Sequence, residues 1–127
     1  MPTTTSFKDM PVWQRSIRLV AEIYQLTARL PASERLGLSG SLQQASLTIP
    51  TDISSGTKAG RSGFRTACLS ARQSCAEVET LLIIVQQVYP TIPVDDLLSE
   101  MSEITDALTA MAKRLDSPDQ KRPRKTI

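Results

Sequence analysis

Apolar residues recur every three or four positions in four separate segments of this 127-residue chain, and prolines or glycines stand between the segments. This spacing gathers side chains on one face of an α-helix, whereas a strand would need apolar residues at alternate positions. The predicted helices span residues 11–29, 39–55, 62–89 and 95–115. Because short connections favour antiparallel neighbours, the pattern predicts an all-α, antiparallel, up-down-up-down four-helix bundle.

One domain accounts for most of the chain. A segment of this length can bury a core, and an aromatic content of 4% indicates that the core is aliphatic. We therefore expect residues 1–115 to form the bundle. Residues 116–127 have two prolines and no apolar period, and they hold four cations against two acids, namely Lys121, Arg122, Arg124 and Lys125 against Asp116 and Asp119. This composition predicts a disordered basic C-terminal tail.

The first, second and fourth segments carry features that predict their packing. In the first, an apolar stripe that we expect to face the core comprises Trp13, Ile17, Val20, Ala21 and Tyr24. In the second, Pro50 lacks the N–H that a helix needs, so this helix should kink or split near Ile49. The fourth has a strict heptad, which suits nearly antiparallel packing: Val94, Leu97, Met101, Ile104, Leu108, Met111 and Leu115.

The third segment is apolar around more of its circumference than a monomeric bundle needs. Its core face comprises Phe64, Ala71, Cys75, Val78, Leu82 and Val85. Further apolar side chains fall outside that face, and we expect them to form an oligomer interface: Leu69, Leu81, Ile83, Ile84 and Val88. Such a patch predicts assembly with copies of the same chain. The alternative is a third helix that the other three helices and the loops bury centrally.

Residues for catalysis are scarce. The chain has no histidine and no glycine-rich phosphate loop, and Glu77 and Glu79 are spaced so that they point away from each other on a helix. Cys68 and Cys75 lie two helical turns apart, too far for a disulfide between them, which predicts reduced, buried thiols. We expect a non-enzymatic protein without cofactor, metal or small-molecule substrate. The longest apolar run has five residues and the N-terminal residues lack a signal sequence, so we expect a cytoplasmic protein that does not bind membranes.

Basic residues indicate a possible nucleic-acid surface. Lys58, Arg61, Arg65 and Arg72 occur without an intervening acid and at helical spacing. Together with the four cations of the tail they could contact phosphates, whereas the few aromatic residues do not favour base stacking. The acidic residues of the fourth helix should face away from any RNA. The alternative is that these cations form a solvated face that keeps the bundle soluble.

Several short sequences occur in an order that resembles a known family over residues 7–115. They are Phe7, Val12-Trp13-Gln14, Ile23-Tyr24 and Leu30-Pro31, then Ala45 and Thr48-Ile49-Pro50-Thr51-Asp52-Ile53-Ser54-Ser55-Gly56, and finally Ala71, Ser74, Glu77, Val78 and Glu79. The chain is thus similar to the four-helix-bundle proteins encoded by intervening sequences in bacterial 23S ribosomal RNA genes. It departs from their pattern at Asp52, Ser55 and Gln73, where the family has Asn, Glu and Gly.

The resemblance implies a four-helix bundle that assembles as a homo-oligomeric ring, a homopentamer in characterised relatives. It extends to the accessory proteins of diversity-generating retroelements, which work with a reverse transcriptase and RNA. No enzymatic activity comes with the family. We therefore expect a bundle that binds RNA, another nucleic acid or a nucleoprotein partner. The alternative is a protein-only scaffold or interaction module.

Overall fold

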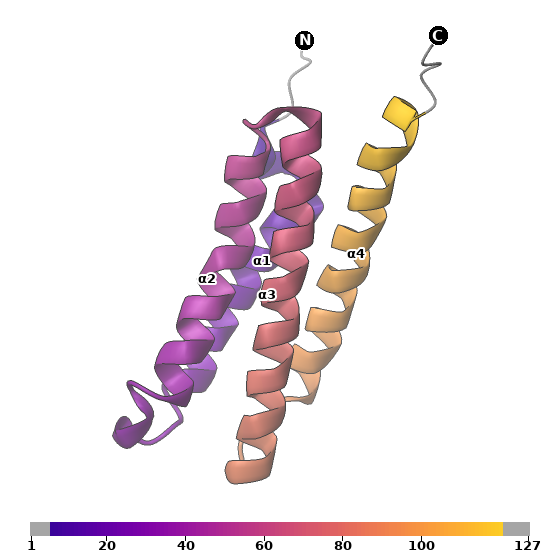
Figure 1. Ribbon diagram of the computed structural model, residues 1–127. Helices are drawn as coiled ribbons and strands as arrows, with labels where there is room; N and C mark the ends of the chain where they lie inside the picture. The colour runs from indigo at the N-terminus through magenta and orange to yellow at the C-terminus, as the bar shows by residue number, and fades with distance from the viewer. Residues whose placement is uncertain (1–5, 121–127) are drawn as a thin grey trace, which may run out of the picture.

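The structure, a computed structural model, describes residues 6–120, and they form four α-helices and no strand (Figure 1). The helices are α1 (Pro11–Thr27), α2 (Leu38–Gly56), α3 (Gly60–Val88) and α4 (Asp95–Gln120). Two 3-10 turns, η1 (Phe7–Asp9) and η2 (Ala32–Glu34), precede α1 and α2. The prediction of an all-helical chain with four helices is confirmed.

The helices pack side by side around one core. Helix α3 lies against α2 and α4, and α1 lies against α2 with a smaller contact to α4. The start of α1, the connection between α2 and α3, and the end of α4 lie at one end of the molecule, at the top of Figure 1. The heptad of α4 is buried from Val94 to Leu108, while Met111 and Leu115 pack partly buried against the core.

The predicted core face of α3 is buried from Ala71 onward, and Phe64 packs partly buried at its edge. Cys68 and Cys75 are free thiols inside this core, with 0% and 1% of their surface exposed. Burial disfavours the thiolate and raises the pKa of each cysteine to about 11. Both side chains therefore behave as small apolar groups at neutral pH.

The predicted core face of α1 is wrong. The buried residues of this helix are Val12, Ser16, Leu19, Ile23, Leu26 and Thr27, whereas Ile17 and Tyr24 are 42% and 43% exposed. Ser16 lies in the middle of the true core stripe and interrupts its apolar pattern. Its hydroxyl donates a hydrogen bond of 2.7 Å to the Trp13 carbonyl, so the helix itself satisfies this buried polar group.

Helix α2 is a single helix, so the predicted split near Ile49 does not occur. Pro50 lies inside it, and an interior proline costs about 3 kcal/mol. Ile49 and Ile53 are fully buried on either side of the proline. Because burial of each large aliphatic side chain contributes about 1.5 to 3 kcal/mol, their packing offsets the cost of the proline.

The last helix extends further along the chain than the sequence predicts. Helix α4 continues to Gln120, beyond the predicted end at residue 115, and the basic residues of the predicted tail lie outside the described residues. Arg65 of α3 forms an ion pair of 3.6 Å with Asp116, a contact that helps to hold α4 against α3 past residue 115. No helix in residues 6–120 is both long and apolar enough to cross a membrane.

Candidate functional site

The arginines that the sequence placed in one stripe of α3 lie along its contact with α4. Arg61 Nη2 donates to the carbonyl of Arg114 at 2.8 Å, and Arg72 Nη1 donates to the Thr109 hydroxyl at 3.2 Å. Arg65 lies between them and pairs with Asp116. The predicted stripe therefore exists, but each of its arginines also binds α4.

Helix α4 adds two cations to this surface that the sequence interpretation missed. Lys113 and Arg114 are exposed, as are Lys58 and Arg61, while Arg65 and Arg72 are partly exposed. We name the six residues Lys58, Arg61, Arg65, Arg72, Lys113 and Arg114 the basic seam. In the segments that carry them, residues 58–72 and 109–116, the only acid is Asp116. These two segments therefore carry six cations against one acid.

Acidic side chains occupy the other half of α4. Arg15 of α1 donates to both carboxylate oxygens of Glu100 at 2.9 Å and also to Glu103. These bonds raise the pKa of Arg15 and lower that of Glu100. Asp95 and Asp96 are exposed in the first turn of α4, where the helix dipole favours negative charge. Charge along α4 thus changes from acidic to basic towards the seam.

The predicted oligomer interface divides into two groups. Leu69 and Leu81 are half-buried and pack against the core. Ile83, Ile84 and Val88 remain outside it, with 45%, 40% and 53% of their surfaces exposed. The alternative, in which the single chain buries all of α3, does not describe this structure. We name Ile83, Ile84 and Val88 the α3 patch.

A second apolar surface lies on α1 and α2. A groove of about 350 Å³ is lined by four of the five α1 residues that the sequence predicts in the core, together with residues of α2, and is formed mainly by Trp13, Ile17, Val20, Ala21, Leu47 and Pro50. We name it the α1–α2 groove. The apolar spacing of these α1 residues was visible in the sequence, but the pattern alone does not say which of two apolar faces a helix buries.

The residues considered for catalysis do not converge. Glu77 and Glu79 are both exposed on α3. Ser74 lies 2.6 Å from the Thr48 hydroxyl of α2, a polar contact inside the bundle. Among residues 6–120, no group of three or more cysteine or acidic side chains could hold a metal ion.

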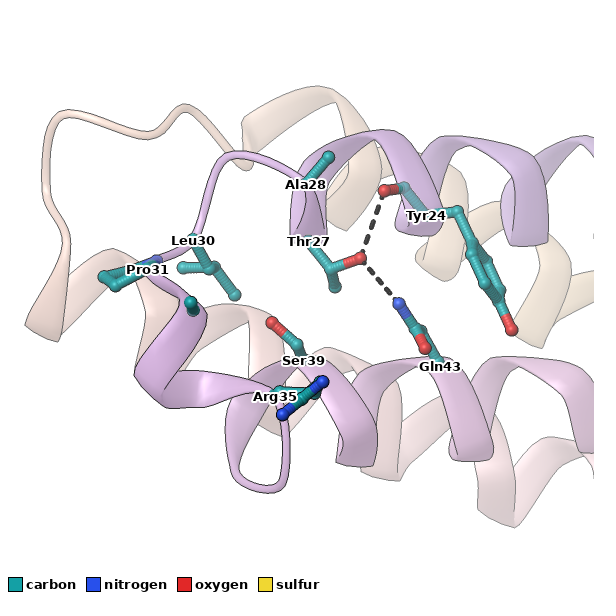
Figure 2. Close-up of a pocket in the computed structure, with 9 residues that line it drawn as sticks. Tyr24, Thr27, Ala28, Leu30, Pro31, Arg35, Ser39 and Gln43 are labelled. Carbon is teal, nitrogen blue, oxygen red and sulfur yellow. Dashed lines mark hydrogen bonds between the residues drawn. The ribbon is translucent and has the colours of Figure 1, made fainter.

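A further pocket lies where α1 ends and α2 begins, and the sequence interpretation did not predict it. Its volume is about 490 Å³ and its lining includes Tyr24, Thr27, Leu30, Arg35, Ser39 and Gln43 (Figure 2). The Thr27 hydroxyl donates to the Tyr24 carbonyl at 3.1 Å and accepts from Gln43 Nε2 at 3.0 Å. No local sequence pattern joins these residues, because the pocket forms only when α1 packs on α2.

The model of a family described as 23S rRNA-intervening sequence protein matches residues 8–110, which include α1, α2, α3 and most of α4. No curated protein matches the chain. The further likeness to the accessory proteins of diversity-generating retroelements stays a prediction.

Proposed function

We propose that this chain, which belongs to the family of 23S rRNA-intervening sequence proteins, is a non-enzymatic, self-assembling bundle that binds RNA through its basic seam. The observation that carries the proposal is the collection of six cations around one acid where α3 and α4 meet. Phosphate contacts supply most of the affinity of proteins that bind nucleic acid without reading bases. We expect it to act in the cytoplasm.

The geometry of the seam suits a phosphate backbone better than bases. Arg61, Lys113 and Arg114 are exposed, and Arg72 binds a neutral hydroxyl, so its charge is not neutralised. No aromatic side chain belongs to the seam, and binding should therefore select weakly among sequences. The acidic half of α4 would repel RNA and confine contact to the positive end.

Reversing charge on the seam tests this proposal. The triple variant Lys58→Glu, Lys113→Glu and Arg114→Glu should bind single-stranded RNA at least about tenfold more weakly, since each lost phosphate contact also removes released counterions. The slope of log affinity against log salt should fall by about 2, at about 0.7 for each contact. Fluorescence anisotropy at several salt concentrations measures both quantities.

The matched control changes the same total charge elsewhere. Arg18→Glu, Arg29→Glu and Arg35→Glu alter exposed cations of α1 and of the connection between α1 and α2. This control should keep most of the affinity for RNA. Equal weakening of RNA binding in both triple variants would show that the basic seam is not the RNA-binding surface. The absence of salt-sensitive binding by the unmodified chain would show the same.

Self-assembly is the second part of the proposal. The α3 patch and the α1–α2 groove lie on different helices and have different shapes, one of projecting side chains and the other concave. Two different apolar surfaces favour a head-to-tail contact, which closes into a ring when the rotation between copies permits. We propose such a ring of up-down-up-down antiparallel bundles, a pentamer by resemblance to the family. Repeating the seam around a ring would raise its affinity for a long RNA.

The protein-only scaffold stays an alternative because Arg65 and Arg72 already have partners on α4. In that case the seam would stabilise the bundle and keep it soluble, and a protein would occupy the outer surface. Light scattering combined with absorbance at 260 and 280 nm, at low and high salt, separates the two. Nucleic acid that co-purifies at low salt and dissociates at high salt supports RNA binding, whereas its absence favours the scaffold.

A further inference from the structure

Arg65 of the basic seam faces a carboxylate. Its Nε lies 3.6 Å from Oδ1 of Asp116, and both side chains are 40% exposed. Arg72, by contrast, donates to the neutral hydroxyl of Thr109 at 3.2 Å and keeps its full charge. Asp116 is also the one acid in the two segments that carry the seam. The charge of Arg65 is therefore opposed at the surface where the proposed function needs it.

The contact between Arg65 and Asp116 is loose. A hydrogen bond between nitrogen and oxygen spans about 2.7 to 3.2 Å, so the two groups attract each other without forming one. The Arg65 Nε is shielded from solvent and makes no hydrogen bond within residues 6–120. The pair of Arg15 and Glu100 in the same protein is tight, with two hydrogen bonds of 2.9 Å. A better acceptor can therefore displace Asp116 from Arg65.

A phosphate of an RNA backbone is such an acceptor. Its oxygens can accept two parallel hydrogen bonds from one guanidinium group. The exposed part of the Arg65 side chain lets a phosphate approach without unfolding of the bundle. Asp116 belongs to the same chain, however, so it stays close to Arg65 and competes at a high effective concentration. Every phosphate that binds Arg65 has to overcome this competition, which lowers the affinity for RNA.

We propose that Asp116 is an intramolecular competitor of RNA phosphates for Arg65, and that it holds the affinity of the basic seam below the value that its cations could reach. This inference rests on the proposed binding of RNA by the seam and concerns the regulation of that site. An RNA that the neighbouring cations already hold can displace Asp116, because its phosphate then competes from a similarly short distance. Without the acid, Arg65 becomes a full phosphate contact.

Fluorescence anisotropy with a labelled single-stranded RNA and the full-length protein tests the proposal. Asp116→Asn should bind this RNA about threefold more tightly, because the exposed ion pair that it removes is weak and the RNA gains one contact. The slope of log affinity against log salt should become steeper by about 0.7 for that contact. In an Arg65→Gln background the same substitution should change the affinity little, since the arginine that Asp116 masks is then absent.

Asp96→Asn is the matched control, because it removes one exposed acid from the first turn of the same helix. Asp96 lies about 30 Å along the helix from Asp116, well beyond the Debye length of about 8 Å in physiological salt. This control should leave the affinity for RNA unchanged, and circular dichroism checks that each variant is folded.

Two results would overturn the role of Asp116 alone. In the first, Asp116→Asn and Asp96→Asn bind RNA with the same affinity. In the second, Asp116→Asn tightens binding equally with and without Arg65, which would make the effect one of general charge. If the unmodified chain shows no salt-sensitive binding of RNA, the basic seam and this inference are overturned together.

Discussion

Gly56, the last residue of α2, allows a close approach between α2 and α3. A Cβ atom at this position would lie 2.4 Å from the Ala67 Cβ and 3.1 Å from Phe64 Cδ1. We predict that Gly56→Ala lowers the free energy of unfolding by about 1 kcal/mol, because overpacking costs about 2 kcal/mol, the middle of its usual range, and the gain in helix propensity offsets about 1 kcal/mol of that cost. Urea unfolding measures the difference.

The neighbouring Ser55→Ala serves as its control, since Ser55 is exposed and its change should stay within about 0.5 kcal/mol. A Gly56→Ala variant as stable as the unmodified protein would show that α2 and α3 can separate locally without cost. Contacts of this kind are not visible in a sequence without the pairing of the helices.

Glu34 and Tyr89 join the connection before α2 to the end of α3, and their hydrogen bond makes stability depend on pH. The bond lowers the pKa of Glu34 from its ordinary value of 4.5 and raises that of Tyr89. A carboxylate with a lowered pKa stabilises the fold above its ordinary pKa, and this stabilisation is lost as the pH falls through the lowered value. The raised pKa of Tyr89 has the opposite sign, so its contribution is lost as the pH rises beyond about 10.

We therefore predict that Glu34→Gln melts at a lower temperature than the unmodified protein at pH 7 and that the gap narrows below about pH 4. Thermal melts followed by circular dichroism at pH 3 and pH 7 provide the comparison. A gap of the same size at both values would mean that the charge of Glu34 does not contribute to the fold.

Ser16 shows where residue-level interpretation of the sequence fails. A helix with two apolar stripes is ambiguous, and the stripe without a polar interruption was the natural choice for the core. The structure buries the other stripe because Ser16 can satisfy its hydroxyl within the helix. The strict heptad of α4 has no such interruption, and its prediction was correct from Val94 to Leu108, whereas beyond it Ala112 is buried and Met111 and Leu115 are only partly so.

At the scale of elements, the bond between Arg15 and Glu100 links the first and last helices. Both side chains are about 30% exposed and the contact is bidentate, so the pair is stronger than an ordinary surface ion pair. A double-mutant cycle of Arg15→Gln and Glu100→Gln should give a coupling energy of about 0.5 to 1 kcal/mol. Chemical denaturation of the four proteins measures it.

Lys8→Gln combined with Glu100→Gln is a suitable comparison cycle, because within residues 6–120 Lys8 neither bonds to Glu100 nor contributes to the shift of its pKa. Its coupling should be near zero. If the Arg15 cycle is also additive, the pair of Arg15 and Glu100 does not stabilise the contact between α1 and α4.

Helix positions could be predicted from the sequence, and pairings of helices could not. All four helices begin within two residues of their predicted starts, since proline, glycine and apolar spacing act locally. The basic seam and the pocket between α1 and α2 each combine residues from two helices. Their members on the second helix, Lys113 and Arg114 in one case and Tyr24 and Thr27 in the other, become neighbours only through packing.

At the scale of the whole molecule, the α3 patch should control assembly. We predict that Ile83→Lys with Ile84→Lys shifts the protein towards the monomer, because the two charges would have to be buried at the contact between copies. Ser99→Lys with Ser102→Lys adds the same two charges at exposed positions of α4, outside the α3 patch and the α1–α2 groove, and should leave the mass unchanged. Size-exclusion chromatography with light scattering gives the mass of each variant.

The central claim is that other copies of the chain cover apolar surface that one copy leaves exposed. Sedimentation velocity of the purified, unmodified protein at micromolar concentration tests it most directly. The account predicts one species whose mass is a multiple of the 13.9 kDa chain. A single species of 13.9 kDa across the concentration range would contradict it.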